Sequence, residues 1–280
     1  MVNLSTKEES MAPKGIITLC FGVAALIVWL FWPGIEPGSS ALKLGIGWIG
    51  VGALEFCTYL YENRKRFSIL KTQWIKRNQP IRATVAYLFR IENNGRYLLI
   101  KRHKKDRPGY QPVGGTYKYF KEESRKDFEE LGIGPCTYIE RDEDTENDLR
   151  IILSKRKKLI GFLKWFDSRK DRELDPWREF FEELVEPGLI SEAHFRHIKY
   201  VFIKKKEEYI SPSPAYPIDE FRYADIYELK LETDDQKRAI QALVGNTGEV
   251  IFATADEIRN EKTQAGEIIL PHTIKILPEC

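Results

Sequence analysis

The sequence predicts a membrane-anchored α+β protein, in which a two-helix transmembrane hairpin precedes a mixed β-sheet domain with flanking helices. Two apolar runs, residues 15–32 and 44–61, are each about 18 residues long, near the lower limit for crossing a bilayer. From residue 81 onward, apolar and polar residues alternate as in strands, and helical patterns stand between these runs. The chain is therefore expected to divide into a membrane part and a globular part.

The hairpin is expected over residues 15–61, after a short N-terminal segment, residues 1–14. The connection at residues 33–40 (PGIEPGSS) is short and rich in proline and glycine, which favours an antiparallel helix pair. A cleaved signal peptide is the alternative for the first run, but no small-residue cleavage pattern follows Trp32. A buried helix of a soluble domain is the alternative for the second run, and its length and glycine content disfavour that reading.

Basic residues predict the orientation of the hairpin. Only Lys43 lies near the connection, whereas residues 62–79 form a basic juxtamembrane linker that contains Arg64, Lys65, Arg66, Lys71, Lys76 and Arg77. Because positive charge collects on the cytoplasmic side, both termini and the globular part are expected in the cytoplasm.

The second helix carries the residues expected to act within the membrane. Its small positions, Gly45, Gly47, Gly50 and Gly52, permit close approach of another helix. Glu55 is costly in hydrocarbon, so it is expected to face another helix or water. The alternative, equally favoured, places Glu55 near the cytoplasmic headgroups, where its charge costs little.

Composition excludes several classes of function. The 44 basic and 42 acidic residues nearly balance, so the chain is no bulk nucleic-acid binder. The cysteines, Cys20, Cys57, Cys136 and Cys280, are scattered along the chain without close pairing. They are typical of reduced thiols, not of a disulfide framework or a metal site.

The globular part, residues 80–280, begins with a strand pair. The runs at 82–91 and 96–101 flank Asn94-Gly95, a sequence typical of a tight hairpin turn. Further strands are expected at 197–204, 226–231 and 249–253, and helices at 155–170, 176–185 and 234–244. This order of elements predicts an α+β domain with a mixed sheet.

The helix expected at 176–185 (PWREFFEELV) carries the chemistry-bearing pattern of the chain. Asp175 is a good N-cap, and Pro176 suits the first helical position. Helical spacing collects the apolar residues on one face and Arg178, Glu179, Glu182 and Glu183 on the other. Such carboxylates could hold Mg²⁺ together with phosphate oxygens. The alternative is an ordinary amphipathic helix with a solvated acidic face.

Three stretches resemble the Nudix superfamily: RATVAYLFRIENNGRYLLIKR, then GYQPVGG, and further on REFFEEL. The resemblance implies a Nudix-like sheet, an orienting salt bridge from Arg178, and Glu179, Glu182 and Glu183 as metal ligands. The chain departs from the family pattern because residues 116–174 separate Gly115 from the helix, and because Lys121 stands where an upstream glutamate is expected. Hydrolysis is therefore not the expected function, and no cofactor is expected. If the protein is a hydrolase after all, it would require Mg²⁺.

The whole architecture resembles a narrower group, the two-transmembrane Nudix-like effectors of bacterial cyclic-oligonucleotide antiphage signalling (CBASS). The resemblance implies a multi-pass protein of the bacterial inner membrane. It also implies a cytoplasmic receptor for a cyclic oligonucleotide made by a cognate nucleotidyltransferase, and a homo-oligomer that compromises the membrane. One alternative is a membrane-anchored Nudix hydrolase of the messenger or of a nucleoside diphosphate derivative. Another is a scaffold that binds only protein.

A cyclic oligonucleotide presents phosphates and base faces, so its site requires cations and aromatic platforms. The residues expected to bind it lie around the glycine loop and on the acidic helix: Lys101, Arg102, Arg107, Tyr110, Gln111, Tyr117, Lys118 and Arg178. His103 and His272 are each isolated in the sequence, and an isolated histidine is more often a surface or core residue than a ligand.

Overall fold

The computed structural model describes residues 51, 76–102, 108–140, 142–245 and 248–278. The expected transmembrane hairpin, with Gly45, Gly47, Gly50, Gly52 and Glu55, and most of the linker lie outside the described residues. Within the described part of the chain, no helix is both long enough and apolar enough to cross a bilayer. The fold described below belongs to one compact unit, Thr72–Cys280.

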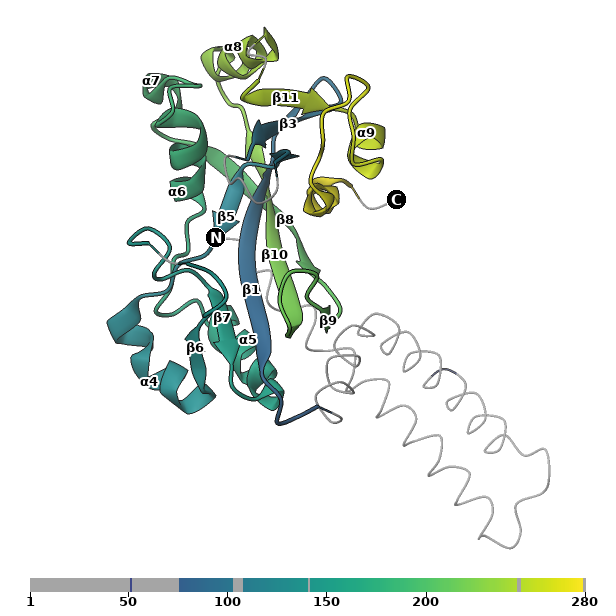
Figure 1. Cartoon of the computed structure of the whole chain (residues 1–280). Helices are drawn as coiled ribbons and strands as arrows, with labels where there is room; N and C mark the ends of the chain where they lie inside the picture. Colours follow the sequence, from purple (N-terminus) through teal and green to yellow (C-terminus); the bar gives the residue numbers. More distant parts are fainter. Residues whose placement is uncertain (1–50, 52–75, 103–107, 141, 246–247, 279–280) are drawn as a thin grey trace, which may run out of the picture. The chain divides into compact units, whose positions relative to one another are not determined.

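Groups of strands and groups of helices follow one another along this unit (Figure 1). The strands are β1 (Ile81–Arg90), β2 (Glu92–Asn93), β3 (Arg96–Lys101), β4 (Tyr110–Gln111), β5 (Gly114–Thr116), β6 (Ile133–Pro135), β7 (Arg150–Leu153), β8 (Lys199–Glu207), β9 (Ser211–Pro212), β10 (Asp219–Lys230) and β11 (Val250–Ala253). The helices are α4 (Lys121–Leu131), η2 (Arg156–Lys158), α5 (Leu159–Asp167), α6 (Trp177–Phe180), the π-helix η3 (Phe181–Val185), α7 (Glu192–Phe195), α8 (Asp234–Ala242), η4 (Leu243–Gly245), α9 (Ala255–Arg259) and η5 (Pro271–Ile276).

The long strand β1 organises the larger sheet, whose order is β6-β7-β1-β10-β8. One edge of β1 pairs in parallel with β10, from Arg82 opposite Glu220 to Arg90 opposite Glu228 (Figure 1). The other edge is shared, because β7 pairs antiparallel with residues 81–84 and β5 pairs with residues 86–88. The mixed sheet that the sequence predicts is therefore confirmed.

Every second residue of β1 is apolar and fully buried: Ile81, Ala83, Val85, Tyr87 and Phe89 are each 0% exposed. The turn between β2 and β3 has the predicted form, since Asn94 and Gly95 have φ values of 52° and 74°, which suit a tight hairpin turn. The strand β3 then joins a smaller sheet with β2, β4 and β11. A core of buried side chains, including Leu88, Leu99 and Ile226, connects the two sheets.

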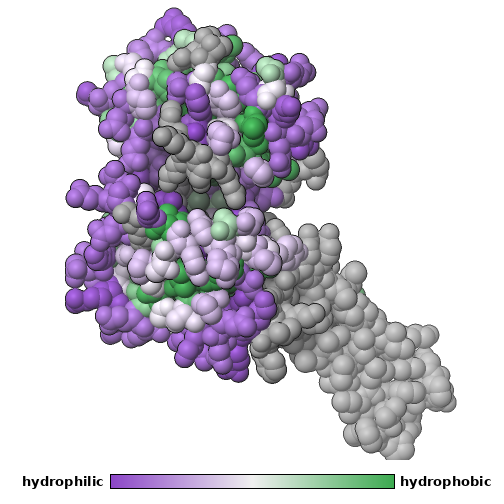
Figure 2. Space-filling view, viewed as in Figure 1, coloured by the Kyte–Doolittle hydropathy of each residue, from purple (hydrophilic) through white to green (hydrophobic). Residues whose placement is uncertain are grey.

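Residues 119–172, here called the insertion segment, depart from the sheet and return to the same place. At their base, the Phe120 N–H donates to the Asp171 carbonyl at 2.9 Å, and the Glu173 N–H donates to the Lys118 carbonyl at 2.8 Å. The segment forms α4, β6, β7 and α5, of which the sequence predicted only the last. Polar residues cover most of the face in Figure 2.

The chain enters β1 through residues that are tied to both of its neighbouring strands. The Lys76 Nζ pairs with Asp219 at the start of β10 at 3.0 Å, and the fully buried Arg156, which follows β7, pairs with the same carboxylate. The Arg156 N–H also donates to the Gln79 carbonyl at 2.8 Å. Hydrogen bonds from Arg156 and Lys76 hold the pKa of Asp219 below its ordinary value.

Candidate functional site

The acidic helix has the two-faced form that the sequence predicts. Phe180 and Leu184 are fully buried, and the Phe180 ring packs against Phe89 with the ring centroids 5.7 Å apart. The helix begins one residue later than predicted, with Pro176 and not Asp175 at the N-cap position, although the Asp175 carboxylate still accepts a hydrogen bond from the Trp177 N–H at 2.9 Å. From Phe181 the helix widens into a π-turn, a feature frequent at functional sites.

Two adjacent glycines let the sheet approach this helix closely. A Cβ atom on Gly115 would lie 2.0 Å from the carboxylate of Glu179, so no larger residue fits there without displacing it. Gly114 has a φ of 140°, and its N–H donates to the Glu183 carboxylate at 2.7 Å. The glycines of β5 therefore bring the backbone into direct contact with the helix carboxylates.

Arg178 connects the carboxylates to one another and to the sheet. Its Nη1 donates to Glu179 and to Glu182, both at 2.9 Å, and its Nη2 donates to the Thr116 carbonyl at 3.1 Å. Burial alone would lower the pKa of Arg178, but hydrogen bonding to Glu173 and the charge of Glu179 outweigh it, and the pKa lies above its ordinary value. The predicted salt-bridge role of Arg178 agrees with these contacts.

Glu173 is a partner of Arg178 that the sequence did not indicate. Its carboxylate accepts from the Arg178 Nε at 2.9 Å and from the Lys118 N–H at 3.2 Å. Glu173 comes directly after the insertion segment, so Arg178 has an acidic partner upstream of the helix although Lys121 stands where the family pattern has a glutamate. Lys121 instead lies on α4 and pairs with Glu146. The available signal was an acid shortly before Arg178 in the stretch DRELDPWRE.

The glutamates of the helix have perturbed acidities. Burial, followed by the charge of Glu179, raises the pKa of Glu183 well above its ordinary value, against the hydrogen bond from Gly114. Burial also raises the pKa of Glu179, although Arg178 opposes that shift. Both shifts favour the protonated acid over the carboxylate, and a nearby positive charge would reverse them.

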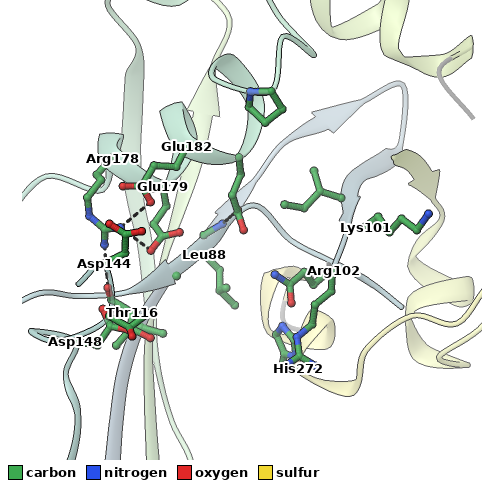
Figure 3. Close-up of a pocket in the computed structure, with 18 of the residues that line it drawn as sticks. Leu88, Lys101, Arg102, Thr116, Asp144, Asp148, Arg178, Glu179, Glu182 and His272 are labelled. Atoms are coloured by element: carbon green, nitrogen blue, oxygen red, sulfur yellow. Dashed lines mark hydrogen bonds and ion pairs between the residues drawn. The ribbon is translucent and has the colours of Figure 1, made fainter. Parts of the chain in front are cut away.

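A pocket of about 730 Å³ opens beside the helix, within the usual size range of small-molecule sites. Figure 3 shows Arg178, Glu179, Glu182, Asp144 and Asp148 on one side of it, and Lys101, Arg102 and His272 on the other. Leu88 lies between the two sides in this view. The remaining lining residues are Ala86, Ile100, Gln111, Gly114, Gly115, Thr116, Lys118, Thr145, Arg150, Glu183, Pro187, Leu189 and Glu249. We call these the acidic side and the basic side, although Arg178 lies among the carboxylates of the first, and the Glu249 carboxylate lies 3.7 Å from the Lys101 Nζ of the second.

Most of the predicted site residues line this pocket: Lys101, Arg102, Gln111, Lys118, Arg178, Glu179, Glu182 and Glu183. Tyr117 does not, because its ring is 1% exposed and its hydroxyl donates to the buried Asp225 at 2.9 Å. Tyr110 is also largely buried, at 9% exposed, and its hydroxyl donates to the Gly248 carbonyl at 3.0 Å. Both rings belong to the core and offer no stacking platform. Arg107 lies outside the described residues.

His272 lines the pocket although the sequence gave little reason to select it. It lies on η5, in the stretch ILPHTIKIL near the C-terminus. Burial, followed by the nearby charges of Lys275 and Arg102, lowers the pKa of His272 to about 4. The imidazole is therefore neutral at physiological pH and can both donate and accept a hydrogen bond.

The carboxylates do not fit a resident Mg²⁺ in the observed arrangement. Within the described ranges, no three His, Cys, Asp or Glu side chains form a group that could hold a metal ion. Glu179 and Glu182 share one nitrogen of Arg178, and Glu183 is bonded to the Gly114 N–H. A divalent cation would have to compete with these partners for the same oxygens.

Comparison with known protein families adds one match. Residues 80–277 match the family model described as the SMODS-associated NUDIX domain. This range covers the globular part that the sequence predicts and includes every residue of the pocket. No curated protein matches the chain.

Proposed function

The chain belongs to the SMODS-associated NUDIX domain family, and on that premise we propose that it is a membrane effector of antiphage defence. It carries a Nudix-like domain of a CBASS-associated protein. In the proposed function, this domain is a receptor for a cyclic oligonucleotide made by a cognate nucleotidyltransferase. Ligand-driven assembly of several copies then compromises the bacterial inner membrane.

The two-sided character of the pocket is the observation that carries the receptor proposal. Lys101 and Arg102 supply charge for ligand phosphates, and the apolar lining beside them suits sugar or base surface. The opposite side has its carboxylates held by Arg178 and Gly114. A site arranged in this way favours binding of a phosphate-bearing ligand over metal-dependent cleavage.

Reversing the charge of Arg102 or Lys118 is expected to weaken cyclic oligonucleotide binding about tenfold or more. A lost charge-assisted contact with phosphate costs about 1.5–3 kcal/mol, which corresponds to a 10- to 150-fold change. Isothermal titration calorimetry of the Arg102→Glu and Lys118→Glu variants measures the effect. The matched control is Lys126→Glu, a charge reversal at an exposed lysine of α4 that does not line the pocket. If all three variants bind the cyclic oligonucleotide with the same affinity, Arg102 and Lys118 do not belong to the binding site.

The alternative function, a membrane-anchored Nudix hydrolase, is favoured by one observation. Glu173, Arg178 and Glu179 form a connected ion-pair network beside the glycine loop, although the insertion segment splits the sequence motif. Turnover of the messenger or of a nucleoside diphosphate derivative that depends on Mg²⁺ would select this function. The decisive variant carries both Glu182→Gln and Glu183→Gln. If it loses this turnover and also the cellular effect of the protein, the hydrolase function replaces the receptor proposal.

The proposed output is a multi-pass inner-membrane hairpin with both termini in the cytoplasm. One pair of helices cannot enclose an aqueous path, so permeabilisation requires several copies of the chain. Glycines at the positions expected in the second helix permit the close helix contact that such a homo-oligomer needs. Glu55 would line or destabilise the assembled region.

Replacing Gly47 and Gly50 with leucine is expected to abolish membrane permeabilisation without changing ligand affinity. The bulky side chains block close helix contact, whereas the receptor domain has its own core. Dye entry into cells that co-express the activating synthase measures permeabilisation. The same exchange at Gly34 and Gly38, in the expected connection, serves as the control. Full permeabilisation by the Gly47 and Gly50 variant, or by a chain lacking residues 1–62, would show that the hairpin is only an anchor.

A further inference from the structure

The basic side of the pocket also contains two uncharged polar side chains, Gln111 and His272. Within the described part of the chain, neither side chain has a hydrogen-bond partner, and each is only partly exposed. Neither residue is among the described side chains whose nitrogen or oxygen atoms are both buried and unpaired, so the polar atoms of both can be reached from the pocket. Their hydrogen-bonding capacity is therefore available to whatever fills the pocket.

The backbone fixes both residues in relation to the cations. Gln111 on β4 pairs with Ile100 on β3, and the neighbouring Arg102 N–H donates to the Gly109 carbonyl at 2.8 Å. On the other side of β4, the Leu270 N–H donates to the Tyr110 carbonyl at 2.9 Å, and His272 follows two residues later. Arg102 and His272 lie next to each other in Figure 3. The backbone hydrogen bonds of β4 thus connect Gln111, Arg102 and the segment that leads into η5, and the charge of Arg102 acts on His272.

The chemistry of this corner separates phosphate binding from base recognition. Arg102 and Lys101 are the charged donors that phosphates prefer. Gln111 and the uncharged His272 each offer both a donor and an acceptor, which is the pattern needed to read the edge of a nucleobase. A glutamine amide matches the adjacent amino group and ring nitrogen of adenine, and this pairing discriminates among bases. Leu88 and Ile100, which are 6% and 5% exposed, form an apolar part of the wall of the same pocket.

We propose that Gln111 and His272 form a base-recognition subsite that selects an adenine base of the ligand, while Lys101 and Arg102 bind its phosphates. This inference rests on the proposed function and adds the class of base that the receptor prefers. His272 acts as a neutral hydrogen-bonding group, so its contribution does not require a change of protonation between pH 6 and 8.

Base selectivity, measured with the full chain, tests the subsite. The probes are cyclic di-AMP, cyclic di-GMP, cyclic di-UMP and a cyclic triadenylate, each titrated by calorimetry at the same salt concentration. The unaltered chain is expected to bind an adenine-containing probe more tightly than the matching guanine or uracil probe. Gln111→Ala and His272→Ala are each expected to reduce that preference about fivefold or more. Arg102→Glu is expected to weaken all probes by similar factors and to leave the preference intact.

Controls separate loss of recognition from loss of folding. Gln241→Ala removes an exposed glutamine of α8 that does not line the pocket, and it should change neither affinity nor preference. Thermal unfolding should be the same for the Gln111 and Gln241 variants. His272→Asn keeps a donor and an acceptor and should retain part of the preference that His272→Ala loses.

The outcomes distinguish this inference from the function on which it rests. If the unaltered chain binds none of the probes, the receptor proposal and the subsite are both overturned. If it binds them and the Gln111 and His272 variants keep its base preference, only the subsite is overturned. A preference for guanine or uracil that both variants abolish would place recognition at these residues and overturn the assignment to adenine.

Discussion

Replacing Gly114 with alanine is expected to lower the free energy of unfolding by at least about 3 kcal/mol, because both its conformation and its surroundings exclude a side chain. Its φ of 140° is a value that residues with a Cβ rarely adopt. The added Cβ would lie 2.3 Å from the Tyr87 carbonyl oxygen of β1, which cannot yield without breaking the pairing of β1 with β5. Chemical denaturation monitored by circular dichroism measures the change.

Gly134 provides the matched control for this substitution. It also lies in a short strand of the same sheet, but a Cβ built there meets no atom within 4 Å. Gly134→Ala is therefore expected to change stability by no more than about 0.5 kcal/mol, as at other surface sites. If the two variants unfold at the same denaturant concentration, the close approach of β5 to β1 is not a determinant of stability.

Arg178→Leu is expected to destabilise the domain by about 3 kcal/mol and to abolish ligand binding. The substitution removes the shared partner of Glu173, Glu179 and Glu182 and leaves these carboxylates together in a partly buried site. Removing one member of a buried ion pair costs about 3–5 kcal/mol, and the lower end applies because the Arg178 side chain is 22% exposed.

Glu182→Gln is the control, since it alters one ion pair at a carboxylate that is 42% exposed. This substitution should lower the free energy of unfolding by less than about 1 kcal/mol, as is usual when an exposed ion pair is lost. Glu173→Gln, at a side chain that is 14% exposed, should fall between the two. Denaturant midpoints in this order would establish that Glu173 completes the network. A Glu173 variant as stable as the unaltered chain would show that Arg178 needs no upstream partner.

The sequence alone predicts the structure correctly where the pattern involves residues that are close together in the chain. The alternation in residues 82–91, the Asn94-Gly95 turn and the two faces of the acidic helix each depend on residues that are close in the chain, and the structure confirms all three. Lys101, Arg102 and Gln111, which were expected to bind the ligand because they lie beside the glycine loop, do line the pocket, and their part in binding stays a prediction.

The sequence was insufficient where a contact depends on how distant segments meet. Glu173 reaches Arg178 because the insertion segment returns to its starting point, and no sequence spacing encodes that closure. Tyr117 was expected to face the ligand because it follows the glycine loop. It is turned inward by Asp225, a carboxylate on β10 that binds its hydroxyl in the core. His272 reaches the pocket from a distant C-terminal segment for the same reason.

The anchoring of residues 76–79 has a mechanical consequence. Lys76 is bound to Asp219 on β10, and the carbonyls of Arg77 and Gln79 are bound to the turn that follows β7, at Lys157 and Arg156. The chain ahead of β1 is therefore clamped to both strands that flank β1. A shift of β7 relative to β10 would therefore have to break either the ion pair between Lys76 and Asp219 or the backbone hydrogen bonds from Arg156 and Lys157.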